Sequence, residues 1–323
     1  MTTRRQFLLA SAVGATYSHV VVAQTRPAKV GMLLARPLNE SFYAPGIVQR
    51  LGELGYREKA GMVLEHRSAD GIAERFPKLA RELIDARCDV IFAVGPEQAA
   101  RALQNAAAPV VVFLAVDYDP LEKGIITSFS KPDRNTTGLY IPQGLLAAKR
   151  LEIMREILPG ARRFLVLSDV FSKDLVPAVR SAAAAAGIQL TVIEFDRSPY
   201  DFVAAFEAAR QAQVDGLIGI PSPVFATRGA EIGALLNQYR LPSAGWAASV
   251  IPAGFLFGYS EDTLKVSRRA AEVGAKILKG TKPSDIPVEQ ADEFVLVINA
   301  TAARSLGVKV PESVLARATK IVQ

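Results

Sequence analysis

The sequence predicts an α/β protein of two lobes, each a parallel sheet with helices on its faces, joined by a multi-strand hinge. Short β-branched apolar runs alternate with amphipathic helical segments along the 323 residues. A turn-rich passage at 131–138 ends one such series, and a second series of the same kind follows it. Two similar series predict two Rossmann-like lobes with a ligand cleft between them.

The first series centres on Val110–Val116, an unbroken apolar run that follows Pro109 and is typical of a strand buried on both faces. We expect an earlier helix to end at Leu54–Tyr56, and a later one at 73–87 has Phe76, Leu79, Ala80 and Leu83 spaced for one buried face. The other expected elements are strands at 29–35, 62–66 and 89–95 and a helix at 97–107. Right-handed crossovers would then place the loops after the strands along one rim.

The second series begins with a helix that carries Leu151, Met154 and Leu158 on one face and stops at Pro159–Gly160. Further expected elements are strands at 164–167, 189–195, 216–220 and 242–244 and helices at 173–186, 200–213 and 227–239. The chain then returns through 255–258, a long helix at 262–278, a strand at 293–298 and short helices near 302–306 and 312–318. The expected boundaries are 27–138 plus about 258–290 for lobe 1, and 139–257 plus about 291–323 for lobe 2.

The composition is that of an ordinary globular protein, with 50% hydrophobic and 22% charged residues. The formal charge of +6 falls to 6 − 2 = +4 without Arg4 and Arg5, and the basic residues form no long run, so no nucleic-acid partner is expected. The single cysteine, Cys88, cannot form an internal disulfide and is expected to be a buried small hydrophobe.

The N-terminus predicts export. Thr3–Leu8 contains a twin-arginine pattern, an apolar run extends from Leu9 to Val22, and Ala23 is suited to a cleavage site. We therefore expect residues 1–23 to be a cleaved export signal of twin-arginine type; an ordinary secretory signal is the alternative. Either route leads to the periplasm, and without a cysteine near the cleavage site a lipid anchor is not expected.

Several motifs occur in order along the chain, and together they carry a family resemblance. They are Leu51–Tyr56, Asn135–Gly138 (N-x-T-G), Lys149–Glu152, Ile277–Pro283, Ile286–Gln290 and Phe294–Asn299. From Val30 onward the chain resembles the periplasmic substrate-binding proteins of ABC transporters, in the tryptophan-binding-protein-like group of the type I periplasmic-binding fold.

The resemblance implies a monomeric receptor that captures a small molecule between its lobes and delivers it to a membrane permease and its ATPase. It implies no cofactor, and it implies hinge roles for Asn135, Thr137 and Gly138. The expected ligand is an amino acid or another small carboxylate, which could be aromatic. A sensory receptor with the same fold and an exported enzyme are the alternatives, whereas a repressor is excluded because an export signal stands where DNA-binding helices would be.

By position, the resemblance places ligand contacts at the ends of strands in both lobes. The expected contacts are Asn39, Ser41, Gly95, Glu97, Gln98, Asp117, Tyr118, Asp119, Asp169, Phe171, Ser222, Phe225, Trp246 and Tyr259. The chain departs from the family pattern at Tyr118, which replaces a glycine, and at Ser222, which replaces an aspartate.

The chemistry of these residues leaves alternatives open. The helix N-terminus at Gly95–Glu97 suits a ligand carboxylate, or it is a plain helix start with Glu97 complementing the dipole. Asp117 and Asp119 could hold an ammonium group or cap a turn. The aromatic residues either form a wall for a flat or cationic ligand or pack the edge of a lobe.

The sequence does not favour an enzyme. It contains no G-x-S-x-G, G-x-x-x-x-G-K-[ST] or G-x-G-x-x-G motif. Of its two histidines, His19 lies in the expected signal, and His66 lies on an expected strand without a second metal ligand or a nucleophile beside it. We therefore expect no catalytic residue and no metal site.

Overall fold

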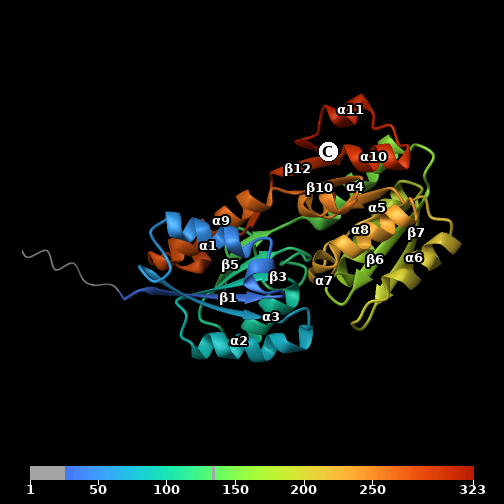
Figure 1. The fold of residues 1–323 in the computed structure, drawn as a ribbon. Coiled ribbons are helices and arrows are strands. Elements are labelled where there is room, and N and C mark those ends of the chain that lie inside the picture. Colours follow the sequence, from blue (N-terminus) through green and yellow to red (C-terminus); the bar gives the residue numbers. More distant parts are fainter. Residues whose placement is uncertain (1–25, 133–134) are drawn as a thin grey trace, which may run out of the picture.

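Two sheets organise the chain, which confirms the predicted α/β class with two lobes (Figure 1). The computed structural model describes residues 26–132 and 135–323, so the expected export signal at 1–23 lies outside the described residues. Within the described part of the chain, no helix is both long enough and apolar enough to cross a membrane.

The first lobe contains six strands in the order β11-β5-β4-β3-β1-β2, and every neighbouring pair is parallel. Helices α1 and α9 cover one face of this sheet, and α2 and α3 cover the other (Figure 1). The strands are β1 (Ala28–Leu34), β2 (Met62–Ser68), β3 (Val90–Gly95), β4 (Val111–Ala115), β5 (Thr136–Tyr140) and β11 (Glu289–Gln290), and the helices are α1 (Ala44–Glu53), α2 (Phe76–Asp85), α3 (Glu97–Asn105) and α9 (Thr263–Leu278).

The second lobe contains seven strands in the order β13-β12-β10-β9-β8-β6-β7, parallel except for the pair β10 and β12. The strands are β6 (Arg163–Asp169), β7 (Gln189–Phe195), β8 (Gly216–Ile218), β9 (Ser243–Gly245), β10 (Phe257–Glu261), β12 (Phe294–Asn299) and β13 (Lys320–Val322). The helices are α4 (Gln143–Ile157), α5 (Val176–Ala185), α6 (Phe202–Gln211), α7 (Pro223–Thr227), α8 (Gly229–Gln238), α10 (Ala300–Leu306) and α11 (Glu312–Leu315).

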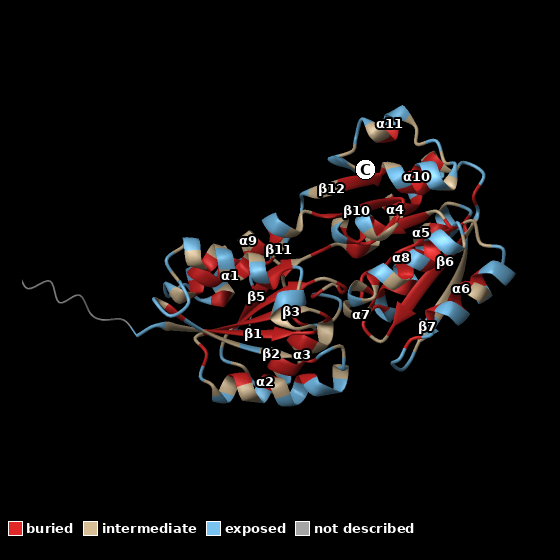
Figure 2. Cartoon of the chain, in the orientation of Figure 1, coloured by how far each residue is buried: buried red, intermediate tan, exposed pale blue. Residues whose placement is uncertain are grey.

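Burial follows the sequence pattern that predicted these elements (Figure 2). All five residues of β4 are buried, as expected for a central parallel strand. On α2, Phe76, Ala80 and Leu83 are buried along one face. Helix α9 begins where the Asp262 carboxylate accepts hydrogen bonds from the backbone N–H groups of Leu264 and Lys265. Local caps and apolar spacing therefore account for where these elements lie.

The two lobes share one strand order, and this order locates the site. Read from one edge, the first sheet runs β2-β1-β3-β4-β5 and the second runs β7-β6-β8-β9-β10. In such doubly wound sheets the ligand crevice opens outside the carboxyl ends of the strands, where the order reverses. The reversal falls between β1 and β3 in the first lobe and between β6 and β8 in the second.

The chain crosses between the lobes three times. It crosses after β5 at 141–142, after β10 at Asp262, and between β11 and β12 at 291–293. The expected return to lobe 1 near residue 258 falls at the start of β10, which still pairs with β9 and β12 in the second sheet. The return therefore begins at Asp262, after the strand has ended.

The residues expected at the hinge lie before the first crossing. The passage interpreted as turn-rich, 131–138, ends inside β5, whose strand character is hidden in the sequence by the polar N-x-T-G motif. Asn135 directly precedes β5, and Thr137 and Gly138 lie inside it, between β4 and β11. The buried hydroxyl of Thr137 donates a hydrogen bond to the Ile286 carbonyl at 2.8 Å, so this polar side chain is satisfied inside the sheet.

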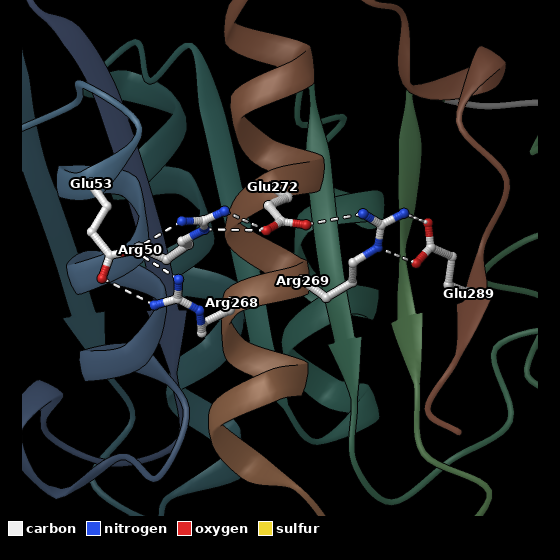
Figure 3. A network of polar contacts seen from close by, with 6 residues as sticks. All are labelled: Arg50, Glu53, Arg268, Arg269, Glu272 and Glu289. Atoms are coloured by element: carbon white, nitrogen blue, oxygen red, sulfur yellow. Dashed lines mark hydrogen bonds and ion pairs between the residues drawn. The ribbon is translucent and has the colours of Figure 1, made fainter. Parts of the chain in front are cut away.

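A network of ion pairs ties α9 to the rest of the first lobe (Figure 3). Arg50 on α1 lies 2.8 Å from Glu272 on α9, and Arg269 donates to Glu289 on β11 at 2.6 Å. Hydrogen bonds from Arg268 and Arg50 lower the pKa of Glu53 to about 2. The helix that the chain forms after leaving the second lobe is thus anchored to both α1 and β11.

Cys88 is buried, as the sequence predicts. Its sulfur lies beside Gly31, where an added Cβ would come within 3.0 Å of it. Burial raises the pKa of the thiol to about 11, which keeps it protonated and unreactive.

Candidate functional site

A cavity of about 80 Å³ lies between the two lobes. From the first lobe it is lined by residues at or just after the ends of β1 (35–36), β3 (94–96) and β4 (116–117) and by the residues just before α1 (41–43). From the second lobe it is lined by residues 221–223 after β8 and 246–247 after β9, with Gln143 and Glu261 contributed next to the crossings. The cavity therefore occupies the place where the carboxyl ends of both sheets meet.

Four side chains of this cavity have a buried polar atom with no hydrogen-bond partner among the described residues. They are Arg36 (Nε), Asp117 (Oδ1), Trp246 (Nε1) and Glu261 (Oε2). The exposed fractions of Asp117, Trp246 and Glu261 are 4%, 5% and 2%. A buried polar group without a partner costs about 1–3 kcal/mol. Such a concentration at one cavity indicates groups that a ligand would satisfy.

Asp117 follows β4 and presents its carboxyl to the cavity. Burial raises the pKa of this carboxyl well above its usual range, since the charged form is poorly solvated there. The negative charges of Asp169, Asp174 and Glu97 raise the pKa further. Asp169 and Asp174 belong to the second lobe, so the carboxyl of Asp117 is influenced by charges from both sides of the cleft.

Glu261 ends β10 directly before the crossing at Asp262 and is held by a residue of the first lobe. The Tyr43 hydroxyl donates a hydrogen bond to Glu261 Oε1 at 2.7 Å, and Oε2 stays free to face a ligand. Burial raises the pKa of Glu261, an effect that the hydrogen bond from Tyr43 opposes. The pair joins the start of α1 to the crossing strand, so its geometry depends on how the lobes are placed.

Asp169 lies behind the cavity and positions Ser222. The carboxylate accepts hydrogen bonds from the Ser172 hydroxyl at 2.8 Å, the Phe171 N–H at 3.1 Å and the Ser222 hydroxyl. The Ser222 oxygen in turn accepts from the Val224 N–H at 3.1 Å and caps α7. Ser222, where the family pattern has an aspartate, is therefore a neutral wall residue oriented by a buried acid.

Arg150 on α4 lies behind the cavity and joins several strand ends. Its fully buried guanidinium donates to the backbone carbonyls of Tyr259 at 2.8 Å, Gly219 at 3.2 Å and Trp246 at 3.3 Å. A fourth hydrogen bond, of 3.3 Å, goes to the Gln143 side chain. Burial lowers the pKa of Arg150 to about 10, so it stays charged at neutral pH. It links the residues that follow β8 and β9 to the middle of β10, behind the cavity wall to which Trp246 and Glu261 belong.

The structure brings five of the expected ligand contacts together at the cavity. These are Ser41, Gly95, Asp117, Ser222 and Trp246. Gly95 ends β3 with a φ of 103°, a conformation that favours glycine, and so lets the chain turn into α3 at the cavity wall. The ligand contacts of all five stay predictions, now supported by a shared position.

The other expected contacts do not line the cavity. They are Asn39, Glu97, Gln98, Tyr118, Asp119, Asp169, Phe171, Phe225 and Tyr259. Asp119 accepts from the N–H groups of Leu121 at 2.7 Å and Glu122 at 3.1 Å, so it caps its own turn. Asn39 is exposed on a short 3₁₀ helix, and Glu97 pairs with Arg101 at 2.7 Å.

The aromatic residues in this group pack within or between the lobes. Tyr118 and Phe171 are buried in one apolar cluster, although they come from different lobes. Phe225 lies in the core of the second lobe, and the half-buried ring of Tyr259 lies 6.0 Å from the ring of Phe294. These four positions therefore follow the alternative in which aromatic residues pack the lobes.

Sequence reasoning missed Tyr43, Gln143 and Glu261, which line the cavity. Glu261 was not predicted as a site residue because the strand that leads back to lobe 1 was expected at 255–258, whereas β10 extends to Glu261 itself. An acid between that strand and the capping residue Asp262 was the available signal, because it falls at the carboxyl end of a strand. Tyr43 and Gln143 gave no comparable signal.

The lobes also contact each other directly outside the cavity. The Gln98 side-chain N–H donates to the Val170 carbonyl at 3.3 Å, and Lys123 pairs with Asp174 at 2.7 Å. These contacts, with the packing of Phe171 against the first lobe, hold the two walls of the cavity together.

Because the buried carboxyl of Asp117 has an oxygen without a hydrogen-bond partner, we expect that replacing it by a neutral amide stabilises the protein. The pKa of Asp117 is higher in the folded than in the unfolded protein. The protonated carboxyl therefore makes its full contribution to the free energy of unfolding below the ordinary carboxyl pKa of about 4, and this contribution is lost as the pH rises through the folded-state pKa. Asp117→Asn removes this loss and should raise the free energy of unfolding at pH 7 by about 1 kcal/mol. Urea unfolding at pH 4 and pH 7 measures the effect.

The gain from Asp117→Asn should shrink at pH 4, where the native carboxyl also carries its proton. Asp285→Asn, at an exposed position, serves as the control and should change stability little at either pH. A variant that is destabilised equally at both pH values would show that Asp117 carries no burial penalty.

Comparison with known proteins agrees with this architecture. A family model described as "ABC transporter substrate binding protein" matches residues 39–322. The chain belongs to this family. This match confirms the family resemblance noted in the sequence. The family consists of binding proteins, which is consistent with the expectation of a protein without catalysis.

Similar proteins include both curated and solved examples. A tyrosine-binding protein of Clostridioides difficile is 23% identical over 264 residues, which cover 81% of this chain and 75% of that protein. A conserved domain protein from Vibrio cholerae has a TM-score of 0.84 with 25% identity and covers 92% of this chain and 100% of that one. An ABC domain in complex with L-Trp from Streptococcus pneumonia has a TM-score of 0.81 with 22% identity and covers 92% and 100%. The structural matches show the type I periplasmic-binding fold.

Proposed function

We propose that this protein is the exported solute-binding component of an ABC uptake transporter and captures an amino acid between its lobes. The observation that carries the proposal is the cavity in which Arg36, Asp117, Trp246 and Glu261 each present an unpartnered buried polar atom. An amino acid supplies the matching groups, because its ammonium donates to carboxylates and its carboxylate accepts from the guanidinium and the indole.

The comparisons support an amino acid as the ligand class. Two similar proteins are described with tyrosine or with L-Trp, and both match most of this chain. The small cavity volume, about 80 Å³, favours a small molecule over an oligosaccharide or a peptide. Family membership supports delivery of the ligand to a permease driven by an ATPase, and the twin-arginine pattern at Thr3–Leu8 supports export to the periplasm.

Capture is proposed to proceed by closure of the lobes about the three crossings. A ligand can shift this equilibrium only if it binds the closed state better, and the cavity meets that condition because both lobes supply its walls. Tyr43 and Glu261 join α1 to a crossing strand, and Lys123 pairs with Asp174 across the cleft. These contacts would form as the lobes come together around the ligand.

Trp246 provides the experiment, because it is the only tryptophan in the sequence and lines the cavity. Titration of the purified protein with the standard L-amino acids should give a saturable change in its fluorescence with at least one of them. That ligand, at 100 times its dissociation constant, should stabilise the protein by about 2.7 kcal/mol in a thermal-unfolding scan.

The variant Trp246→Phe is the control and should lose the fluorescence signal. If no amino acid gave a saturable fluorescence signal and none stabilised the protein, the proposed ligand class would be refuted.

A further inference from the structure

The unpartnered groups of the cavity restrict the chemistry of its ligand. Asp117 Oδ1 and Glu261 Oε2 are acceptors, and Arg36 Nε and Trp246 Nε1 are donors. A ligand that satisfies all four needs nitrogen donors toward the two carboxyls and an acceptor toward the guanidinium and the indole. The two carboxyls also come from different places, because Asp117 follows β4 of the first sheet and Glu261 ends β10 of the second.

The charges next to the cavity are not balanced. Three buried carboxyls (Asp117, Asp169 and Glu261) stand against two guanidiniums (Arg36 and Arg150), which leaves one negative charge in excess if all are ionised. Arg150 makes no ion pair within the described residues and is partnered by carbonyl oxygens.

The charges at the rim do not remove this excess. Glu97 pairs with Arg101, and Lys123 pairs with Asp174, so these four residues balance one another. Glu40 lies 3.8 Å from Arg36 and weakens its positive field in the cavity. The site as a whole therefore favours a ligand that brings a net positive charge.

The aromatic lining is suited to such a ligand. Phe42, Tyr43 and Trp246 line the cavity, and aromatic ring faces attract ammonium and guanidinium groups. The Arg36 guanidinium already lies 5.1 Å from the centre of the Phe42 ring, so this wall holds a cation within the protein itself. Tyr43 is in addition bonded to Glu261, which places a ring and a carboxyl side by side.

Resting on the proposed capture of an amino acid, we propose that the cavity selects amino acids with a positively charged side chain. One of the two carboxyls, Asp117 or Glu261, binds the α-ammonium group, and the other binds the side-chain cation. Arg36 and Trp246 bind the α-carboxylate. Burial raises the pKa of both acids, and a cation that replaces the retained proton would allow each carboxylate to ionise in place.

Ligand pairs that differ in the charged end of the side chain test the proposal by isothermal titration calorimetry of the purified protein. L-arginine should bind at least about tenfold more tightly than L-citrulline, and L-lysine more tightly than L-norleucine, because only the charged member makes the second charge-assisted contact. Equal affinities within both pairs would overturn the inference.

The outcomes for other amino acids separate the two proposals. Tight binding of L-tryptophan or L-tyrosine with no binding of L-arginine or L-lysine would overturn the side-chain preference and leave amino-acid capture standing. No binding by any amino acid would overturn the proposed function as well.

Two conservative variants assign the carboxyls. One of the variants Asp117→Asn and Glu261→Gln should weaken the binding of arginine and of citrulline by the same factor. The other should abolish the difference in affinity between these two ligands. If each variant weakened both ligands by the same factor, a single ammonium group would be bridged by both acids, and the inference would fail. Glu58→Gln, an exposed acid-to-amide change, is the matched control and should leave both affinities unchanged.

Discussion

Gly138→Ala is expected to lower the free energy of unfolding by about 3 kcal/mol. Gly138 lies in β5 opposite Phe113 of β4, and a Cβ at this position would lie 2.8 Å from the Phe113 nitrogen and closer still to its carbonyl oxygen. Both atoms belong to the backbone, so no side-chain rotation relieves the clash. The strands would have to separate and break hydrogen bonds at the centre of the first sheet.

Urea unfolding of Gly138→Ala beside Gly160→Ala tests this prediction. An added Cβ at Gly160 meets no atom within 4 Å, so that variant carries the same chemical change without the clash and should be within about 0.5 kcal/mol of the native protein. A similar small effect at Gly138 would mean that β4 and β5 can move apart at little cost.

Gly138 also shows how far the sequence can be interpreted. The N-x-T-G motif indicated the family, and the structure explains its glycine by the close approach of two backbones. The motif's polar residues, however, predicted a turn, because strand propensity and burial of Thr136 and Thr137 depend on the neighbours β4 and β11. The alternation of elements is encoded locally, whereas the pairing that buries a polar strand is not.

The candidate site shows the same division. Residues at or shortly after the ends of strong strands, such as Gly95, Asp117 and Ser222, could be placed at the cavity because carboxyl ends of parallel strands share one edge. Asp119 and Glu97 lie only a few residues away but satisfy their own turn and helix. Which way a side chain faces in a loop depends on local hydrogen bonds that spacing alone does not reveal.

Arg150→Met is expected to lower the free energy of unfolding by about 3–5 kcal/mol. The guanidinium is fully buried, and its loss would leave the carbonyls of Gly219, Trp246 and Tyr259 without this donor. Its positive charge also lowers the pKa of Glu261, so the variant would leave that carboxyl less compensated. The same variant should weaken ligand binding, because Trp246 and Glu261 lose the group that fixes the wall between them.

Three comparisons in urea unfolding separate these causes. Arg155→Met, an exposed change on the same helix, should stay within about 0.5 kcal/mol of the native protein. Arg150→Lys keeps the charge without the planar donor fork, so it should lie between the native protein and Arg150→Met. Adding Glu261→Gln to Arg150→Met should recover part of the loss if the uncompensated carboxyl contributes to it. A loss below about 1 kcal/mol in Arg150→Met would instead show that water or a rearranged loop can replace the arginine, and that the cavity wall does not depend on it.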